Sequence, residues 1–138
     1  MEDVFIHISR GKFNGINALA NENGVIAAAA MDQRDALRKA IAKVRGAPAT
    51  DAELSEFKVL VAEALTPYAT AILLDPEYGL EAVQKSREGA ILQRTKNAGV
   101  ILSYEKTGYD PAVKGRLPTL LSHWSVKRLV DVGANAVK

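Results

Sequence analysis

The chain has 138 residues, of which 18 are basic and 16 acidic, and its formal net charge is +2. This length is enough for one domain with a buried core, and the interspersed acidic and basic residues give no reason to expect a nucleic-acid partner. The absence of cysteine excludes disulfides, thiolate metal ligands and a cysteine nucleophile, and no apolar run is long enough to span a bilayer.

The first 23 residues give weak structural signals. Their acidic start, Met1-Glu2-Asp3, lacks the basic segment of a signal peptide, so we expect a cytoplasmic protein. We interpret residues 1–23 as an irregular or helical amino-terminal extension of a single domain that covers residues 1–138. The apolar residues that could line one side of a helix there are Ile6, Ile8, Phe13, Ile16 and Leu19.

After this extension, short apolar runs alternate with helix-like segments. We expect strands at residues 25–31, 71–74, 99–104 and 134–137. We expect helices or helical turns at residues 37–44, 51–66, 80–88, 91–97 and 123–132. This alternation indicates an α/β fold with right-handed parallel crossovers, so that all strands end at the same edge of one sheet.

The clearest helix start is Thr50-Asp51-Ala52-Glu53, which matches a capping box. The buried stripe expected on the helix that follows is Leu54, Phe57, Val61, Ala64 and Leu65. Pro67 should stop this helix, because proline cannot donate the next main-chain hydrogen bond.

The last helix is expected to begin at Ser122, whose side chain can cap the amino end. The apolar residues expected along it are Trp124, Val126, Leu129 and Val130. Gly133 fits the position just past its carboxyl end, where a left-handed conformation is common.

Polar clusters follow the predicted strands, where ligands bind in parallel α/β folds. The residues at or just past these strand ends are Asp32, Gln33, Arg34, Asp75, Glu77, Glu105, Lys106 and Lys138. Carboxylates and lysines brought together in this way shift each other's pKa values. A lysine among them can serve as an amine nucleophile, a proton shuttle or an anchor for an anion. The pattern therefore predicts a site, but it does not define a reaction.

Each cluster also has a structural interpretation. Asp32 could simply cap the helix that follows it, and residues 75–79 could be only a turn. Glu105 and Lys106 could form an ion pair at the rim of the sheet. Lys138 could be a mobile side chain at a frayed end.

Unusual strings occur in these clusters, among them LLDPEYG and YEKTGYD, and the neighbouring segments include GVIAAAAMDQRDALRKA and GANAVK. Through these strings the chain resembles the class I tagatose 1,6-bisphosphate aldolases, which are Schiff-base aldolases on (β/α)₈ barrels. The resemblance implies a partial TIM barrel, about the first four strands with their helices, since a complete barrel needs about 250 residues. We therefore expect a fragment of a longer enzyme that is inactive alone.

The resemblance also implies the reaction and the roles of single residues. It implies aldol cleavage of tagatose 1,6-bisphosphate, a ketohexose 1,6-bisphosphate, to dihydroxyacetone phosphate and glyceraldehyde 3-phosphate. No metal or other cofactor is needed, because a lysine imine serves as the electron sink. Asp32 and Gln33 match an active-site Asp-Gln pair, and Lys138 matches an active-site lysine that is not the imine-forming one, which lies on a later strand. We predict Asp32 and Lys138 as catalytic residues. The predicted substrate-binding residues are Gln33, Arg34, Asp75, Glu105 and Lys106.

The sequence is also compatible with two other functions. One is an aldolase for another phosphorylated or sulfonated ketose. The other is a non-catalytic half-barrel that is stable by self-association, because an open half-barrel leaves a strand edge unpaired. We expect no nucleic-acid or membrane partner, and a homo-oligomer is left open.

Overall fold

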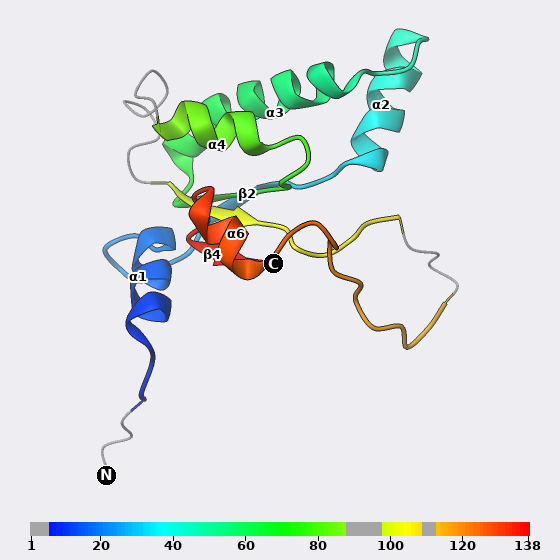
Figure 1. Cartoon of the computed structure of the whole chain (residues 1–138). Coiled ribbons are helices and arrows are strands. Elements are labelled where there is room, and N and C mark those ends of the chain that lie inside the picture. Colours follow the sequence, from blue (N-terminus) through cyan, green and yellow to red (C-terminus); the bar gives the residue numbers. More distant parts are fainter. Residues whose placement is uncertain (1–5, 88–97, 109–112) are drawn as a thin grey trace.

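The computed structural model describes residues 6–87, 98–108 and 113–138 (Figure 1). Among these residues, four parallel strands form one sheet in the order β1-β2-β3-β4. The strands are β1 Ala28–Met31, β2 Ala71–Leu74, β3 Gly99–Leu102 and β4 Ala136–Val137. Each strand pairs with the next one along the chain, so the sheet advances by one strand at every crossover, as it does in a barrel.

The predicted strands are confirmed, with β2 at the predicted bounds and the others shorter than predicted. The alanine-rich β1 is a strand although alanine favours helix. Its residues pair one for one with β2, from Ala28 opposite Ala71 to Met31 opposite Leu74. Tertiary pairing therefore decides the conformation of this segment.

Helices connect and cover the strands. Their bounds are α1 Arg10–Leu19, α2 Asp35–Arg45, α3 Asp51–Leu65, α4 Leu80–Arg87 and α6 Val126–Asp131, with a 3₁₀ turn at Thr66–Tyr68. Figure 1 shows α3 and α4 side by side over one face of the sheet, with α1 near the amino ends of the strands and α2 beyond the carboxyl end of β1. The helical turn predicted at residues 91–97 lies outside the described residues.

The capping box at the start of α3 is confirmed. The Thr50 side chain accepts a hydrogen bond from the main-chain N–H of Glu53, and the Glu53 carboxylate accepts one from the main-chain N–H of Thr50 at 2.8 Å. This main-chain hydrogen bond is the largest cause of a lowered pKa at Glu53. α3 ends at Leu65, immediately before the 3₁₀ turn that contains Pro67.

The predicted buried stripe on α3 is largely wrong. Phe57 is 37% exposed and Leu65 is 42% exposed. The residues that α3 buries are Leu54, Lys58, Val59 and Ala62. The sequence pattern placed the apolar face wrongly because a lysine occupies the centre of the face that packs inward.

The ends of the chain also differ from expectation. α6 is capped by Ser125, not Ser122, and Trp124 lies before the helix, although Gly133 follows it with a φ of 120° as expected. In the amino-terminal extension, Ser9 caps α1. Of the apolar residues predicted to line a helix there, Leu19 is buried, whereas the others are exposed.

The core lies between the central strands and the helices. Ile72 and Leu74 of β2 stand beside Val100 and Leu102 of β3, in register. They are buried against residues of α3, α4, α6 and the segment after α6: Val59, Ala62, Ala82, Val83, Leu129 and Ala134. In the part of the chain that the structure describes, no helix is long and apolar enough to cross a membrane.

Candidate active site at the strand ends

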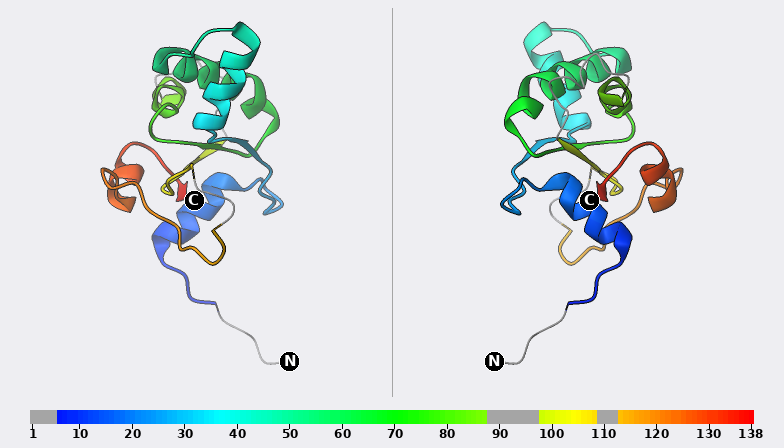
Figure 2. Two further views of the ribbon diagram at one scale, coloured as in Figure 1. Left: turned by 90° about the vertical axis from the view of Figure 1, so that its right-hand side faces the viewer. Right: turned by 90° about the vertical axis from the view of Figure 1, so that its left-hand side faces the viewer.

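The candidate site is built from the first residue after each strand. Met31, Leu74, Leu102 and Val137 are the last residues of the four strands and share one register. The residues that follow them are Asp32, Asp75, Ser103 and Lys138. Figure 1 shows that the segments after β1 and β3 leave the same side of the sheet, and the left view of Figure 2 looks onto that side. The topology therefore brings these four side chains to one edge. The sequence predicted this position for Asp32, Asp75 and Lys138, whereas Ser103 was expected within the third strand.

Asp32 and Lys138 form an ion pair across this edge. The Lys138 Nζ donates to Asp32 Oδ2 at 2.7 Å, and the two side chains are 51% and 11% exposed, respectively. The two residues follow the outer strands β1 and β4, which would be about 14 Å apart in a flat sheet with strands about 4.8 Å apart. Side chains stand roughly perpendicular to a sheet, so a contact over this span fits a sheet that curves as a barrel wall does.

The structural interpretations of these two residues are wrong. The N-cap residue of α2 is Arg34, and no side chain caps this helix, so Asp32 is not its cap. The main chain of Lys138 is held at the end of the sheet: its N–H donates to Leu102, and its carbonyl accepts from Tyr104. Lys138 therefore has a defined position and a partner.

A second ion pair joins Lys58 of α3 to Asp75, the residue that follows β2. The Lys58 Nζ is 2.5 Å from Asp75 Oδ2, and both side chains are fully buried. The ammonium group also donates to the carbonyl oxygens of Met31 at 2.8 Å and Gln33 at 2.7 Å. Sequence reasoning missed Lys58, although its position four residues after Leu54 and four before Ala62 indicates the same helix face.

Asp75 also shapes the turn after β2. Its Oδ1 accepts hydrogen bonds from the main-chain N–H groups of Glu77 at 3.0 Å and Tyr78 at 2.8 Å. The interpretation of residues 75–79 as a turn is thus confirmed. Because protein groups occupy both carboxylate oxygens of Asp75, a direct contact between Asp75 and substrate stays a prediction.

Arg34 joins the segments that follow three strands. Its guanidinium donates to Glu77 Oε2 at 2.8 Å, to the carbonyl oxygen of Glu105 at 2.7 Å and to Ser103 Oγ at 3.4 Å. Its side chain is only 4% exposed. These contacts make Arg34 a connector of the strand-end segments, and its predicted contact with substrate stays a prediction.

The other predicted binding residues lie toward the rim. Gln33 and Lys106 are exposed, whereas Glu105 is partly buried. Within the described residues, no ion pair joins Glu105 to Lys106, so that interpretation is wrong; the Glu105 carboxylate lies 3.9 Å from Arg116. The structure leaves Gln33 and Lys106 accessible at the edge where the Asp32–Lys138 pair lies, and their roles stay predictions.

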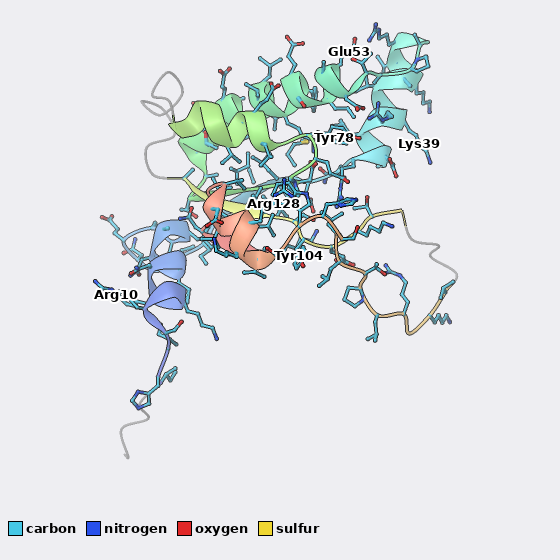
Figure 3. The ribbon with its side chains drawn as sticks, viewed as in Figure 1. Arg10, Lys39, Glu53, Tyr78, Tyr104 and Arg128 are labelled. Atoms are coloured by element: carbon cyan, nitrogen blue, oxygen red, sulfur yellow. The ribbon has the colours of Figure 1, made fainter. Side chains whose placement is uncertain are left out.

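Arg38 attaches α2 to this edge. It pairs with Asp51, donates to the carbonyl oxygen of Ala49 and donates to the hydroxyl of Tyr78 at 3.1 Å. The hydrogen bond to Asp51 is the largest cause of a raised pKa at Arg38, and the Tyr78 hydroxyl adds to it. Figure 3 shows Tyr78 on the side of its loop that faces α2.

A cavity of about 1130 Å³ lies at the opposite, amino-terminal ends of the strands. The residues that line it include Asn17, Thr70, Gly99 and Asn135, and its acidic group, Glu22, is exposed. Among the described residues, no group of three or more His, Asp or Glu side chains could hold a metal ion. The carboxylates and cations that can carry chemistry are thus gathered at the carboxyl ends.

The family model of the DeoC/LacD aldolases matches residues 26–138, which include every strand of the sheet and the candidate site. The chain belongs to the DeoC/LacD aldolase family. This membership, together with parallel strands in sequential order, makes the fold a partial TIM barrel. The Asp32–Lys138 pair accordingly lies at the end of the barrel wall where barrel enzymes carry their active sites.

Individual members of the family are also similar to this chain. Proteins named tagatose 1,6-diphosphate aldolase from Staphylococcus aureus strains JH9, Newman and JH1 are each 51% identical to it over 130 residues. The match covers 94% of this chain and 37% of each relative. The chain thus spans little more than a third of the length of the curated relatives that it matches.

Proposed function

We propose that this chain supplies one side of the active site of a class I aldolase that cleaves tagatose 1,6-bisphosphate. The products are dihydroxyacetone phosphate and glyceraldehyde 3-phosphate. The observation that carries the proposal is the Asp32–Lys138 ion pair at the strand ends of a chain that is 51% identical to proteins named for this aldolase. The protein would act in the cytoplasm, in the breakdown of lactose, galactose or tagatose.

The proposed reaction proceeds through a lysine imine. A lysine from a later strand, which this chain does not include, attacks the C2 ketone, and water leaves to form the imine. A base then takes the proton of the C4 hydroxyl, the C3–C4 bond breaks, and the aldehyde leaves. The electron pair of that bond passes into an enamine, which is protonated at C3, and water hydrolyses the imine to release the second product.

The two paired residues would both contact this substrate, each with its own role. Lys138 is half exposed, so its ammonium group can leave Asp32 to bind a substrate oxygen or phosphate as a point charge. Asp32 is mostly buried and has a fixed position, so its carboxylate can orient a substrate hydroxyl and the imine-forming lysine. Gln33, exposed beside Asp32, would bind substrate by its amide.

The proposal is tested by borohydride trapping of the protein at its full natural length with dihydroxyacetone phosphate. Reduction of an imine leaves a stable covalent adduct that mass spectrometry detects on one lysine. The expected result is one adduct per active site, formed without a divalent metal and located on a lysine other than Lys138. The absence of an adduct, or cleavage activity that requires a divalent metal, would contradict the class I mechanism.

A substrate panel tests which ketose is cleaved. The similarity to proteins named tagatose 1,6-diphosphate aldolase favours tagatose 1,6-bisphosphate. The panel should include fructose 1,6-bisphosphate and a sulfonated ketose phosphate. Cleavage of the sulfonated substrate with no activity on tagatose 1,6-bisphosphate would replace the proposed substrate and leave the imine mechanism intact.

A further inference from the structure

Lys58 is a fully buried charged residue that the proposed reaction does not use. It lies near the middle of α3, on the face that also buries Leu54 and Ala62. A lysine rarely occurs in such a position unless its charge is paired. Its surroundings therefore indicate what the charge does.

The ammonium group of Lys58 contacts three protein groups. It donates hydrogen bonds to the carbonyl oxygens of Met31 and Gln33, at 2.8 and 2.7 Å, and its Nζ forms an ion pair with Asp75 Oδ2 at 2.5 Å, an oxygen that accepts no hydrogen bond within the described residues. An ammonium group has three donors and no acceptor. Lys58 is thus held by two hydrogen bonds and one ion pair, so its geometry is that of a fixed anchor and not of a free nucleophile.

The two carbonyl acceptors lie on either side of one residue. Met31 immediately precedes Asp32, and Gln33 immediately follows it. Lys58 therefore holds the main chain before and after Asp32, the residue whose carboxylate contacts Lys138. Through Asp75, the same ammonium group is also linked to the turn after β2.

Such a buried pair is a poor source of stability. Removing two charges from water costs several kcal/mol each, and replacing a buried ion pair with apolar residues is often neutral or stabilising. A buried pair directly behind a candidate site is better explained by the geometry that it imposes, because barrel enzymes need site residues held within a fraction of an ångström.

We propose that Lys58 is a positioning residue: neutralised by Asp75, it fixes the main chain on both sides of Asp32 and thereby holds the Asp32 carboxylate against Lys138. The kinetic consequence of this inference rests on the proposed aldolase function. The structural consequence, the position of the Asp32 carboxylate, does not depend on that function. An experiment can therefore contradict the positioning role of Lys58 without contradicting the aldolase function, and the reverse.

The structural test is a crystal structure of the double variant Lys58→Met/Asp75→Leu, made in the protein at its full natural length. This variant removes both charges and keeps apolar volume, so that no unpaired charge is left buried. We expect the segment around Asp32 to move and the 2.7 Å contact with Lys138 to be lost. An unchanged contact in the variant would overturn the inference, whether or not the protein is an aldolase.

The kinetic test compares this variant with Lys58→Gln/Asp75→Asn, which keeps a donor for the carbonyl oxygens. With tagatose 1,6-bisphosphate as the probe, the Met/Leu variant should lose about 10-fold to 100-fold in kcat with little change in KM, the effect of a misplaced reacting group. The Gln/Asn variant should retain more of the kcat. The reverse order, or a wild-type kcat in both variants, would contradict a positioning role.

Val59→Ala is the matched control. Val59 is the next residue of α3 and is buried in the core, but its side chain packs with the apolar cluster. Its truncation should lower the melting temperature and leave kcat and the Asp32–Lys138 contact unchanged. If the Met/Leu variant does not fold, Lys58→Met/Asp75→Asn replaces it, because the asparagine amide oxygen can still accept from the main-chain N–H groups of Glu77 and Tyr78 while the donors of Lys58 are lost. A lowered kcat at unchanged KM in this variant supports the inference, and a wild-type kcat overturns it.

Discussion

Asp32 and Lys138 are 106 positions apart in the sequence, and their side chains meet at 2.7 Å. They follow the first and last strands of the described sheet, so this contact joins the two ends of the row of residues that follow the strands. Their charges are opposite and both groups reach the edge where a ligand would bind. At the edge of a barrel, the ammonium group of Lys138 is suited to bind an anionic sugar, and the carboxylate of Asp32 is suited to orient its hydroxyl groups.

Substituting Asp32→Asn should abolish most of the activity and spare the fold. Loss of a positioned carboxylate typically costs about 10²-fold to 10⁴-fold in rate, and a partly exposed ion pair contributes only about 0–1 kcal/mol to stability. Steady-state cleavage of tagatose 1,6-bisphosphate and urea unfolding check the two effects. A folded variant with wild-type kcat would remove Asp32 from the reaction.

Substituting Lys138→Met should weaken substrate binding more than Asp32→Asn does. The ammonium group is proposed to bind an oxygen or a phosphate, so KM for the bisphosphate should rise by about 10-fold or more, since a hydrogen bond to a charged group is worth about 1.5–3 kcal/mol. Lys138→Arg keeps the charge and serves as the control. Equal KM values in the wild type, Lys138→Met and Lys138→Arg would show that Lys138 does not bind the substrate.

Substituting Lys58→Ala alone should be strongly destabilising. It leaves the Asp75 carboxylate buried without its counter-charge, and breaking one partner of a buried pair costs about 3–5 kcal/mol. Lys127→Ala is the control, because Lys127 pairs with Asp131 on the exposed surface of α6 and its loss should cost less than about 1 kcal/mol. Similar urea midpoints for the two variants would contradict the buried geometry.

The capping box makes a prediction for acid pH. The pKa of Glu53 is lowered in the folded chain, first by the main-chain N–H of Thr50 and then by its side chain. The stabilisation is therefore fully present above the unfolded pKa of about 4.3 and is lost as the pH falls through the lower folded value. Glu53→Gln should be less stable than wild type at neutral pH, and the difference should shrink below about pH 4. Urea unfolding at several pH values checks this; a constant difference would contradict it.

Gly79 makes a prediction for the turn that carries Asp75. A Cβ at this position would lie 2.5 Å from the carbonyl oxygen of Asp75 and 2.9 Å from the Leu74 Cβ. Gly79→Ala should thus destabilise the chain by about 1–3 kcal/mol through overpacking. Gly11→Ala is the control, because a Cβ there meets nothing within 4 Å and alanine favours the helix α1. Thermal unfolding should move in opposite directions for the two variants, and a shift in the same direction would contradict the close packing at Gly79.

Much of the fold could be predicted from local signals in the sequence. The apolar run at Ala71–Leu74, the capping box at Thr50 and the glycine after α6 each report a local physical constraint, and each is confirmed. The strand ends also place Asp32 and Lys138 correctly at one edge. These features depend on short-range chemistry, which a single sequence contains.

The remainder depends on long-range contacts. Lysine usually lies on the protein surface. The burial of Lys58 is explained only by its hydrogen bonds to the carbonyl oxygens at the end of β1. Arg34 likewise became a connector because the segments after β2 and β3 approach it. Ser122 and Ser125 are equally good caps by sequence, and the tertiary structure selects Ser125. Local patterns do not contain this information.

The central claim, that Asp32 and Lys138 belong to one active site, is tested most directly by a double-mutant cycle. The measurement is kcat/KM for tagatose 1,6-bisphosphate in the wild type, Asp32→Asn, Lys138→Met and the double variant, at the full natural length. Residues that act as a unit are strongly non-additive, so the double variant should lose little more than the worse single variant. Losses that multiply, or single variants with wild-type activity, would contradict the claim.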